Sequence, residues 1–158
     1  MYEFLQETVA NNMTRSVRSV TPETSVGDLY RLFAADDFNA YPVVRDDTLV
    51  GIVSKLDALK VFAFATDQLL PHYSDGMVKT VDQIMTSDIV TVDGDTKLQR
   101  VLQLMVENRI RSVPVVDQWR NLVGIIARED VMRAMEKCTL RQEAPMVPFE
   151  TARCLASG

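Results

Sequence analysis

A chain of 158 residues with a formal net charge of −5 has the length of one compact domain. The acidic balance argues against a general electrostatic attraction to DNA or to anionic lipid. No apolar run approaches the ~20 residues that span a bilayer, and residues 1–6 lack the basic and apolar parts of a secretory signal. We therefore expect Cys138 and Cys154 to be free thiols in a reducing cytoplasm.

The first half of the chain alternates between helix and strand patterns. Residues 2–12 are expected to form a short helix, and the β-branched run at 17–20, which Pro22 ends, predicts a short strand. A helix follows, because apolar side chains recur at the spacing of one helix face, at Val26, Leu29, Tyr30 and Phe33. Nearly continuous apolar runs at 40–44 and 49–54 predict strands covered on both faces.

The segments after these strands have their own signals. The short polar connection Asp47-Thr48 favours an antiparallel hairpin. A final helix begins near Lys55, and its apolar spacing could carry it on as far as Pro71. Residues 71–79 are then expected to form a loop between the two halves of the chain.

The second half repeats this order of elements. Its expected strands, with a hairpin connection at 119–121, are 89–92, 112–116 and 122–127. Its first helix carries the apolar stripe of Leu98, Val101, Leu102 and Met105. Thr96 with Gln99 has the spacing of a capping box at the start of that helix. The last helix begins near Arg128, and residues 139–158, with two prolines, are expected to form a loose tail.

The two halves also align residue by residue. Residues 13–60 match 85–133 at an offset of 72, which rises to 73 after one extra residue in the second copy. The longest identities are Met13-Thr14 with Met85-Thr86, Pro42-Val43-Val44 with Pro114-Val115-Val116, and Leu49-Val50-Gly51-Ile52 with Leu122-Val123-Gly124-Ile125. A fixed period indicates duplicated units that bury their apolar faces on each other. Such a pseudo-twofold pair leaves two related clefts at its seam.

This pattern resembles the tandem cystathionine-β-synthase (CBS) domain pair, also called a Bateman module. The matching features are the Met-Thr pair, the Pro-Val-Val and Leu-Val-Gly-Ile strands, and the Ser/Thr-x-x-Asp that opens the last helix. The last motif stands as Ser54-Lys55-Leu56-Asp57 and as Ala127-Arg128-Glu129-Asp130. The fold expected from the resemblance is α/β (α+β), with each repeat a small three-stranded sheet flanked by helices. Its divisions are an N-terminal helix 1–12, repeats 13–70 and 85–138, a linker 71–84 and a tail 139–158.

The resemblance implies a non-catalytic regulatory module. Members bind AMP, ADP, ATP or S-adenosylmethionine in the clefts between the repeats and signal by a change of conformation or partner, with no obligatory cofactor. The chemistry fits the residue types, because a carboxylate can accept hydrogen bonds from both ribose hydroxyls and a helix N-terminus with a nearby cation suits phosphate. A homodimer is expected, with a regulated enzyme or transporter as a further candidate partner. Nucleic acid and membrane insertion are not expected.

The resemblance also carries two sets of site residues onto this chain. The first site takes Ser54, Lys55, Asp57, Thr86, Val90, Ile110, Arg111 and Ser112. The second site takes Thr14, Arg18, Phe38, Asn39, Ala40, Arg111, Arg128 and Asp130. Ala127 departs from the expected Ser/Thr and removes a hydroxyl from the second site. Because that site includes Arg111 and Arg128, we expect it to prefer phosphorylated ligands.

Each of these features also has a purely structural interpretation. Ser54-x-x-Asp57 is an ordinary helix-capping box, and Asp130 could act on the helix dipole alone. Arg111 and Arg128 could be solvated surface charges. The competing hypothesis is therefore a structural dimerisation module with degenerate, unoccupied pockets.

The sequence offers little that points to catalysis. Nothing in it resembles a nucleophile with its base, a P-loop or a metal triad, so no enzymatic role is expected. The lone histidine, His72, has no ligand-spaced neighbours and is not predicted to bind a metal. Trp119, at the expected tip of a hairpin, is a candidate partner contact.

Overall fold

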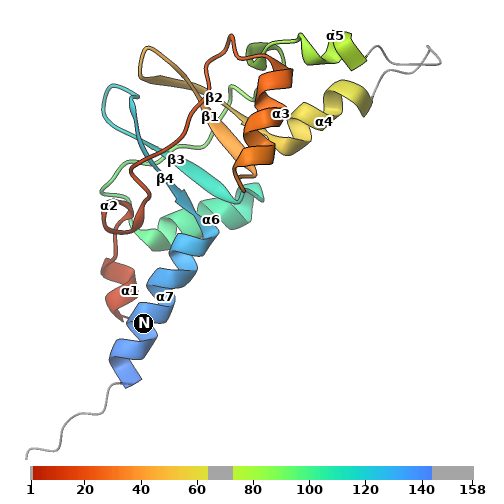
Figure 1. Ribbon diagram of the computed structural model, residues 1–158. Coiled ribbons are helices and arrows are strands. Elements are labelled where there is room, and N and C mark those ends of the chain that lie inside the picture. The colour runs from red at the N-terminus through yellow and green to blue at the C-terminus, as the bar shows by residue number, and fades with distance from the viewer. Residues whose placement is uncertain (1, 64–72, 144–158) are drawn as a thin grey trace, which may run out of the picture.

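The computed structural model describes residues 2–63 and 73–143 and places two hairpins in the middle with helices on their outer sides (Figure 1). The first repeat contains α3 (Val26–Ala35), β1 (Ala40–Arg45), β2 (Thr48–Ser54) and α4 (Lys55–Ala63). The second contains α6 (Leu98–Asn108), β3 (Ser112–Val116), β4 (Leu122–Ala127) and α7 (Arg128–Glu143). Shorter elements precede each repeat: α1 (Tyr2–Gln6), α2 (Val9–Asn12), α5 (Tyr73–Met77) and the 3₁₀ turn η1 (Val81–Gln83). Within these residues, no helix is both long and apolar enough to cross a bilayer.

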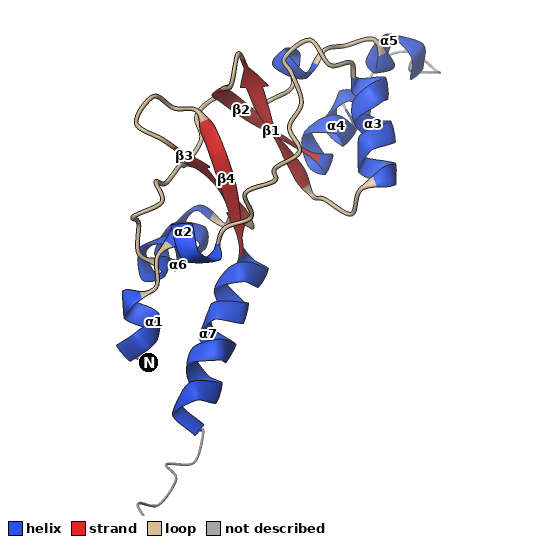
Figure 2. Cartoon of the chain, turned by 60° about the vertical axis from the view of Figure 1, so that its left-hand side comes forward, coloured by secondary structure: helices blue, strands red, loops and turns tan. Residues whose placement is uncertain are grey.

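Each repeat is built on one antiparallel hairpin, β1–β2 or β3–β4 (Figure 2). Third strands were expected at 17–20 and 89–92. At these places the structure forms one parallel bridge in each repeat, Val20 with Val43 and Val92 with Val115. Proline explains the loss in the first repeat. The Val20 N–H donates to the Pro42 carbonyl at 3.0 Å, but the neighbouring ladder positions on both sides fall on Pro42 and Pro22, which have no N–H to donate.

The hairpins meet at their tips. The first turn consists of Asp46 and Asp47, with φ values of 50° and 66°, so the connection lies one residue before the expected Asp47-Thr48. Two consecutive positive φ values suit the right-handed twist of a hairpin, and Asp tolerates them better than most residues. The two tips are tied together because the Asp47 carbonyl accepts a hydrogen bond from the Leu122 N–H at 3.1 Å.

The core of each repeat is completed by the segment that precedes the other repeat. Residues 8–14 and 80–86, which we call the lead segments, match at the same offset of 72. Val9 is buried in the core of the second repeat, and Thr14 exchanges two backbone hydrogen bonds of 2.9 and 3.0 Å with Ile125. Val81 is buried in the core of the first repeat in the same way. Each lead segment thus packs into the core of the repeat that it does not precede.

Several expected elements differ in the structure. The helix expected over 2–12 is two helices, α1 and α2, because the chain between them bridges Thr8 to Lys97. The loop expected at 71–79 contains α5, and α7 runs on to Glu143, so the tail does not begin at 139. The continuation of α4 beyond Ala63 towards Pro71 lies outside the described residues.

The expected capping box at the start of α6 is wrong. Lys97 is the N-cap residue, and no side chain caps the helix there. Thr96 instead donates its hydroxyl to Asp93 Oδ1 at 3.0 Å. The turn before the helix therefore uses the hydroxyl that the sequence pattern assigned to the cap.

Candidate functional site

A cleft of about 660 Å³ opens between the repeats, where the end of β2 and the start of α4 face the segment ahead of β3. Its volume lies within the range of about 300–1,000 Å³ that is typical of small-molecule sites. Every residue carried over to the first site lines it, namely Ser54, Lys55, Asp57, Thr86, Val90, Ile110, Arg111 and Ser112. The structure therefore brings this set together from four separate stretches of both repeats.

Asp57 opens α4 at the wall of this first cleft. Its Oδ2 accepts hydrogen bonds from the Ser54 N–H at 2.8 Å and from the Ser54 hydroxyl at 2.7 Å. The Asp57 N–H donates back to Ser54 Oγ at 3.1 Å, so the structural interpretation as a capping box is confirmed. The other oxygen, Oδ1, lies 3.6 Å from Lys60 Nζ. This oxygen keeps lone pairs that a ribose hydroxyl could use.

The first cleft carries more positive than negative side chains. Lys55, Arg109 and Arg111 line it, against the carboxylates of Asp57 and Asp88. Arg111 is exposed and forms no ion pair with any described residue. Sequence reasoning missed Arg109 and Asp88, although both flank residues that it selected.

A second, smaller cleft of about 280 Å³ lies on the other side of the seam. Seven of the eight residues carried over to the second site line it: Thr14, Arg18, Phe38, Asn39, Ala40, Arg111 and Asp130. The eighth, Arg128, lies elsewhere. Its Nε donates to the Ile110 carbonyl at 3.1 Å, and its side chain borders a groove between α6 and α7. Arg128 therefore does not line the second cleft, contrary to our expectation that it reaches a phosphate there.

Asp130 occupies the position in the second cleft that Asp57 holds in the first. Its Oδ2 accepts from the Ala127 N–H at 2.9 Å, while Oδ1 accepts from Arg133 at 3.0 Å. Ala127 has no hydroxyl to donate or accept, so the two capping bonds that the Ser54 hydroxyl makes in the first repeat are missing here. Both oxygens of Asp130 are engaged, and the residue is buried.

Arg18 enters the second cleft already paired. Its guanidinium donates to both carboxylate oxygens of Asp36, at 2.5 and 2.6 Å. Asp36 also accepts the Tyr41 hydroxyl at 2.8 Å. Burial, together with this hydrogen bond to a carboxylate, raises the pKa of Tyr41 to about 12. Much of the positive charge of Arg18 is therefore neutralised before any ligand binds.

The second cleft is richer in carboxylates than the sequence comparison indicated. Asp37 and Glu129 line it in addition to Asp130. Glu129 was missed because the family motif leaves its position unspecified, although the repeat alignment places it opposite the apolar Leu56. With Arg128 outside and Glu129 inside, this cleft does not have the basic character that we expected.

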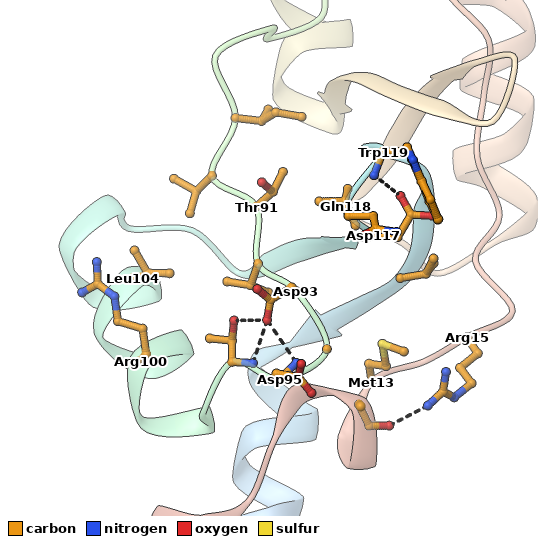
Figure 3. A pocket seen from close by; sticks show the side chains of 18 residues that line it. Met13, Arg15, Thr91, Asp93, Asp95, Arg100, Leu104, Asp117, Gln118 and Trp119 are labelled. Carbon is orange, nitrogen blue, oxygen red and sulfur yellow. Dashed lines mark hydrogen bonds between the residues drawn. The ribbon is translucent and has the colours of Figure 1, made fainter.

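A third and wider hollow of about 1,110 Å³ lies on the second repeat (Figure 3). Two of its polar groups have partners close by in the chain: the Trp119 N–H donates to Asp117 at 2.9 Å, and Arg15 donates to the Ala10 carbonyl at 3.0 Å. Trp119 is 70% exposed on its rim. Among the described residues, no group of three acidic, histidine or cysteine side chains could hold a metal ion. The clefts at the seam are therefore the better candidates for a ligand site.

Two α+β repeats that complete each other's cores and share two clefts define a tandem-repeat module. Comparison with known proteins identifies the repeat. The family model of the CBS domain matches the chain twice, at residues 7–63 and 81–137. This chain belongs to the CBS domain family.

The relatives of this chain are similar over most of its length. Protein MJ1225 of Methanocaldococcus jannaschii is 31% identical over 132 residues, which cover 80% of this chain and 46% of that protein. This chain spans less than half the length of MJ1225. Of another curated relative that it matches, it spans 21% of the length.

Two similar structures were solved with adenosyl compounds. CBSX2 of Arabidopsis thaliana in complex with AMP is 32% identical, with a TM-score of 0.72, and the match covers 84% of this chain and 98% of that one. The CBS domain pair of protein MJ0100, in complex with 5′-methylthioadenosine and S-adenosyl-L-methionine, is 26% identical with a TM-score of 0.70 and the same coverage.

Proposed function

We propose that this chain is a non-catalytic regulatory module that binds an adenosyl ligand between its two repeats. The observation that carries the proposal is the first cleft, because all eight residues expected there line a single hollow built by both repeats. The complexes of CBSX2 with AMP and of the MJ0100 pair with S-adenosylmethionine support the class of ligand.

The residues of the first cleft suggest a role for each part of such a ligand. Asp57 Oδ1 would accept from the ribose hydroxyls, and the small apolar side chains of Val90 and Ile110 would flank the base. The N-terminus of α4, with Lys55 beside it, would receive a phosphate. A ligand held this way touches both repeats, so it would favour the arrangement of repeats that it fits best.

We further propose that two copies of the chain pair through their outer helices. Leu56 on α4 is 61% exposed and Met132 on α7 is 60% exposed, and other large apolar side chains of these helices lie near them in sequence. Exposed apolar surface of this kind marks interaction sites on soluble proteins. A second copy would cover both helices at once.

The buried, free thiol of Cys138 is consistent with a cytoplasmic module.

A structural dimerisation module with empty pockets is the second candidate. It is favoured by Asp130, whose two oxygens are both occupied by internal partners, and by Ala127, which lacks the expected hydroxyl. These observations concern the second cleft, whereas Asp57 keeps one oxygen with lone pairs to spare. For this reason we place the ligand proposal first.

Calorimetric titration of the full chain with AMP, ATP and S-adenosylmethionine tests the choice. We expect saturable binding of at least one of them, together with a rise in melting temperature, because a ligand that binds only the folded state stabilises it. Absence of both signals for all three compounds would instead support the structural module.

A further inference from the structure

Arg111 stands where the two clefts meet. It lines both of them, as do its neighbour Ser112 and the matching residues of the first repeat, Asn39 and Ala40. The pseudo-twofold relation would give each cleft an arginine of its own if both repeats carried one. Because the first repeat has Asn39 at this position, the two clefts share one guanidinium. A phosphate that draws Arg111 into one cleft removes it from the other.

The first cleft remains basic without that shared residue. Lys55 and Arg109 both line it, and Lys55 Nζ lies 5.9 Å from the centre of the Phe33 ring on the same repeat. The N-terminus of the nine-residue helix α4 adds partial positive charge at the same wall. With a volume of about 660 Å³, this cleft has room for a nucleoside together with its phosphates.

The second cleft offers a phosphate little. Apart from Arg111, the basic residue that lines it is Arg18, whose guanidinium is bound to both oxygens of Asp36. Asp37 and Glu129 are exposed carboxylates on its walls and would repel an anion. Repulsive groups of this kind exclude a ligand as effectively as attractive groups select one.

From these differences, and resting on the proposed function, we infer that the two clefts sort adenosyl ligands by charge. The first cleft takes a phosphorylated adenosyl compound. The second takes an adenosyl compound without phosphate, either neutral or cationic, such as a thioether or a sulfonium derivative. The module would then bind two classes of metabolite at the same time. This reverses the order expected from the sequence, in which the second site was the phosphate site.

The test is calorimetric titration of the full chain with AMP and with S-adenosylmethionine, each alone and each in the presence of a saturating amount of the other. We expect one AMP and one S-adenosylmethionine per chain, bound together without displacement. Two AMP molecules per chain with similar affinity would overturn the inference. Mutual displacement at a single site would overturn it as well.

Two variants assign each ligand to its cleft. Lys55→Ala, in the first cleft, should weaken AMP about 10- to 100-fold, because a charge-assisted contact is lost, and should leave S-adenosylmethionine unchanged. Glu129→Leu gives the second cleft the residue that the first repeat carries at the matching position. It should weaken S-adenosylmethionine several-fold and admit a second AMP. Equal losses for both ligands in Lys55→Ala, or no change in Glu129→Leu, would overturn the assignment.

Arg31→Ala is the matched control, because it removes a cation from α3 that is 85% exposed and lies outside both clefts. It should change neither titration. The outcomes also separate the inference from the proposal beneath it. If AMP, adenosine and S-adenosylmethionine all fail to bind a chain that melts normally, the proposed function fails and takes the inference with it. Two equivalent AMP sites would leave the proposed function standing and refute the sorting by charge alone.

Discussion

At the scale of single residues, the aspartates in the first turns of α4 and α7 act as helix caps. Asp57 receives two hydrogen bonds on one oxygen, and Asp130 has both oxygens engaged. Capping and ribose binding are therefore compatible at Asp57, since a carboxylate has about four lone-pair sites. The two interpretations that the sequence left open do not exclude each other at this position.

We expect Asp57→Asn to weaken AMP binding about 10- to 100-fold, because the neutral amide is a poorer acceptor for the ribose hydroxyls. The unliganded chain should also lose about 1 kcal/mol of unfolding free energy, because the cap is weakened. Titration with AMP and with its 2′,3′-dideoxy analogue separates the two effects. If the variant costs the dideoxy compound as much as AMP, Asp57 is a cap alone.

The raised pKa of Tyr41 leads to a second prediction, about the stability of the fold at alkaline pH. Its pKa is raised from 10.0 to about 12, so the folded chain holds this proton more tightly than the unfolded chain does. The stabilisation is complete below pH 10 and is lost as the pH rises from 10 to 12, by about 1–3 kcal/mol. Tyr41→Phe should lower stability by about 1 kcal/mol at pH 7 and flatten this alkaline decline.

Urea unfolding at a series of pH values measures the Tyr41 effect. Tyr2→Phe, at a tyrosine that is 75% exposed, is the control and should leave the profile of the parent chain unchanged. An alkaline decline that persists in full in Tyr41→Phe would show that other groups cause it.

At the scale of elements, each Leu-Val-Gly-Ile strand lies against the lead segment of the other repeat. A Cβ added to Gly124 would lie 2.9 Å from the carbonyl oxygen of Thr14, and the matching distance from Gly51 to Thr86 is 3.0 Å. The Thr14 carbonyl is fixed by its hydrogen bond from Ile125. The glycine is thus needed for the close approach of two backbones.

Gly124→Ala should therefore lower the free energy of unfolding by about 1–3 kcal/mol, as expected for an overpacked contact. Gly27→Ala, in α3, makes an instructive comparison, because the added Cβ would have its nearest neighbour, the Met77 carbonyl oxygen of α5, at 3.4 Å. That change should raise stability by about 0.5–1 kcal/mol, the usual gain of alanine over glycine in a helix. Chemical denaturation measures both, and a neutral Gly124→Ala would contradict the close-packing explanation.

The elements also show which predictions a sequence can support. The hairpins and the helices α3, α4, α6 and α7 follow from local apolar patterns. The family resemblance selected eight residues that line the first cleft but missed Asp88 and Arg109. The single bridges at Val20 and Val92 were foreseeable in part, since Pro22 and Pro42 interrupt the ladder. The position of Arg128 could not be foreseen, because its side chain is held by the Ile110 carbonyl, which lies 18 residues away in the chain. Crossed packing of the lead segments has no local signature either.

At the scale of the whole molecule, the outer helices predict self-association. We expect sedimentation at micromolar concentration to show a dimer of the 17.8 kDa chain. Met132→Lys, which places a charge on the exposed face of α7, should shift the population to monomer, because a buried unpaired charge is costly. Lys137→Ala, on the same helix, is the control. A parent chain that sediments only as a monomer would contradict the pairing.

The crossed lead segments also set an order of events during synthesis. The first repeat and residues 80–86, which complete it, are close together in the chain, so this half can close as soon as the ribosome has delivered them. Residues 8–14 have no such neighbour. They must wait until Thr96 and then Ile125 have emerged, and only then can the second half close around them. Of the two lead segments, the one that is synthesised first is therefore the later one to be packed.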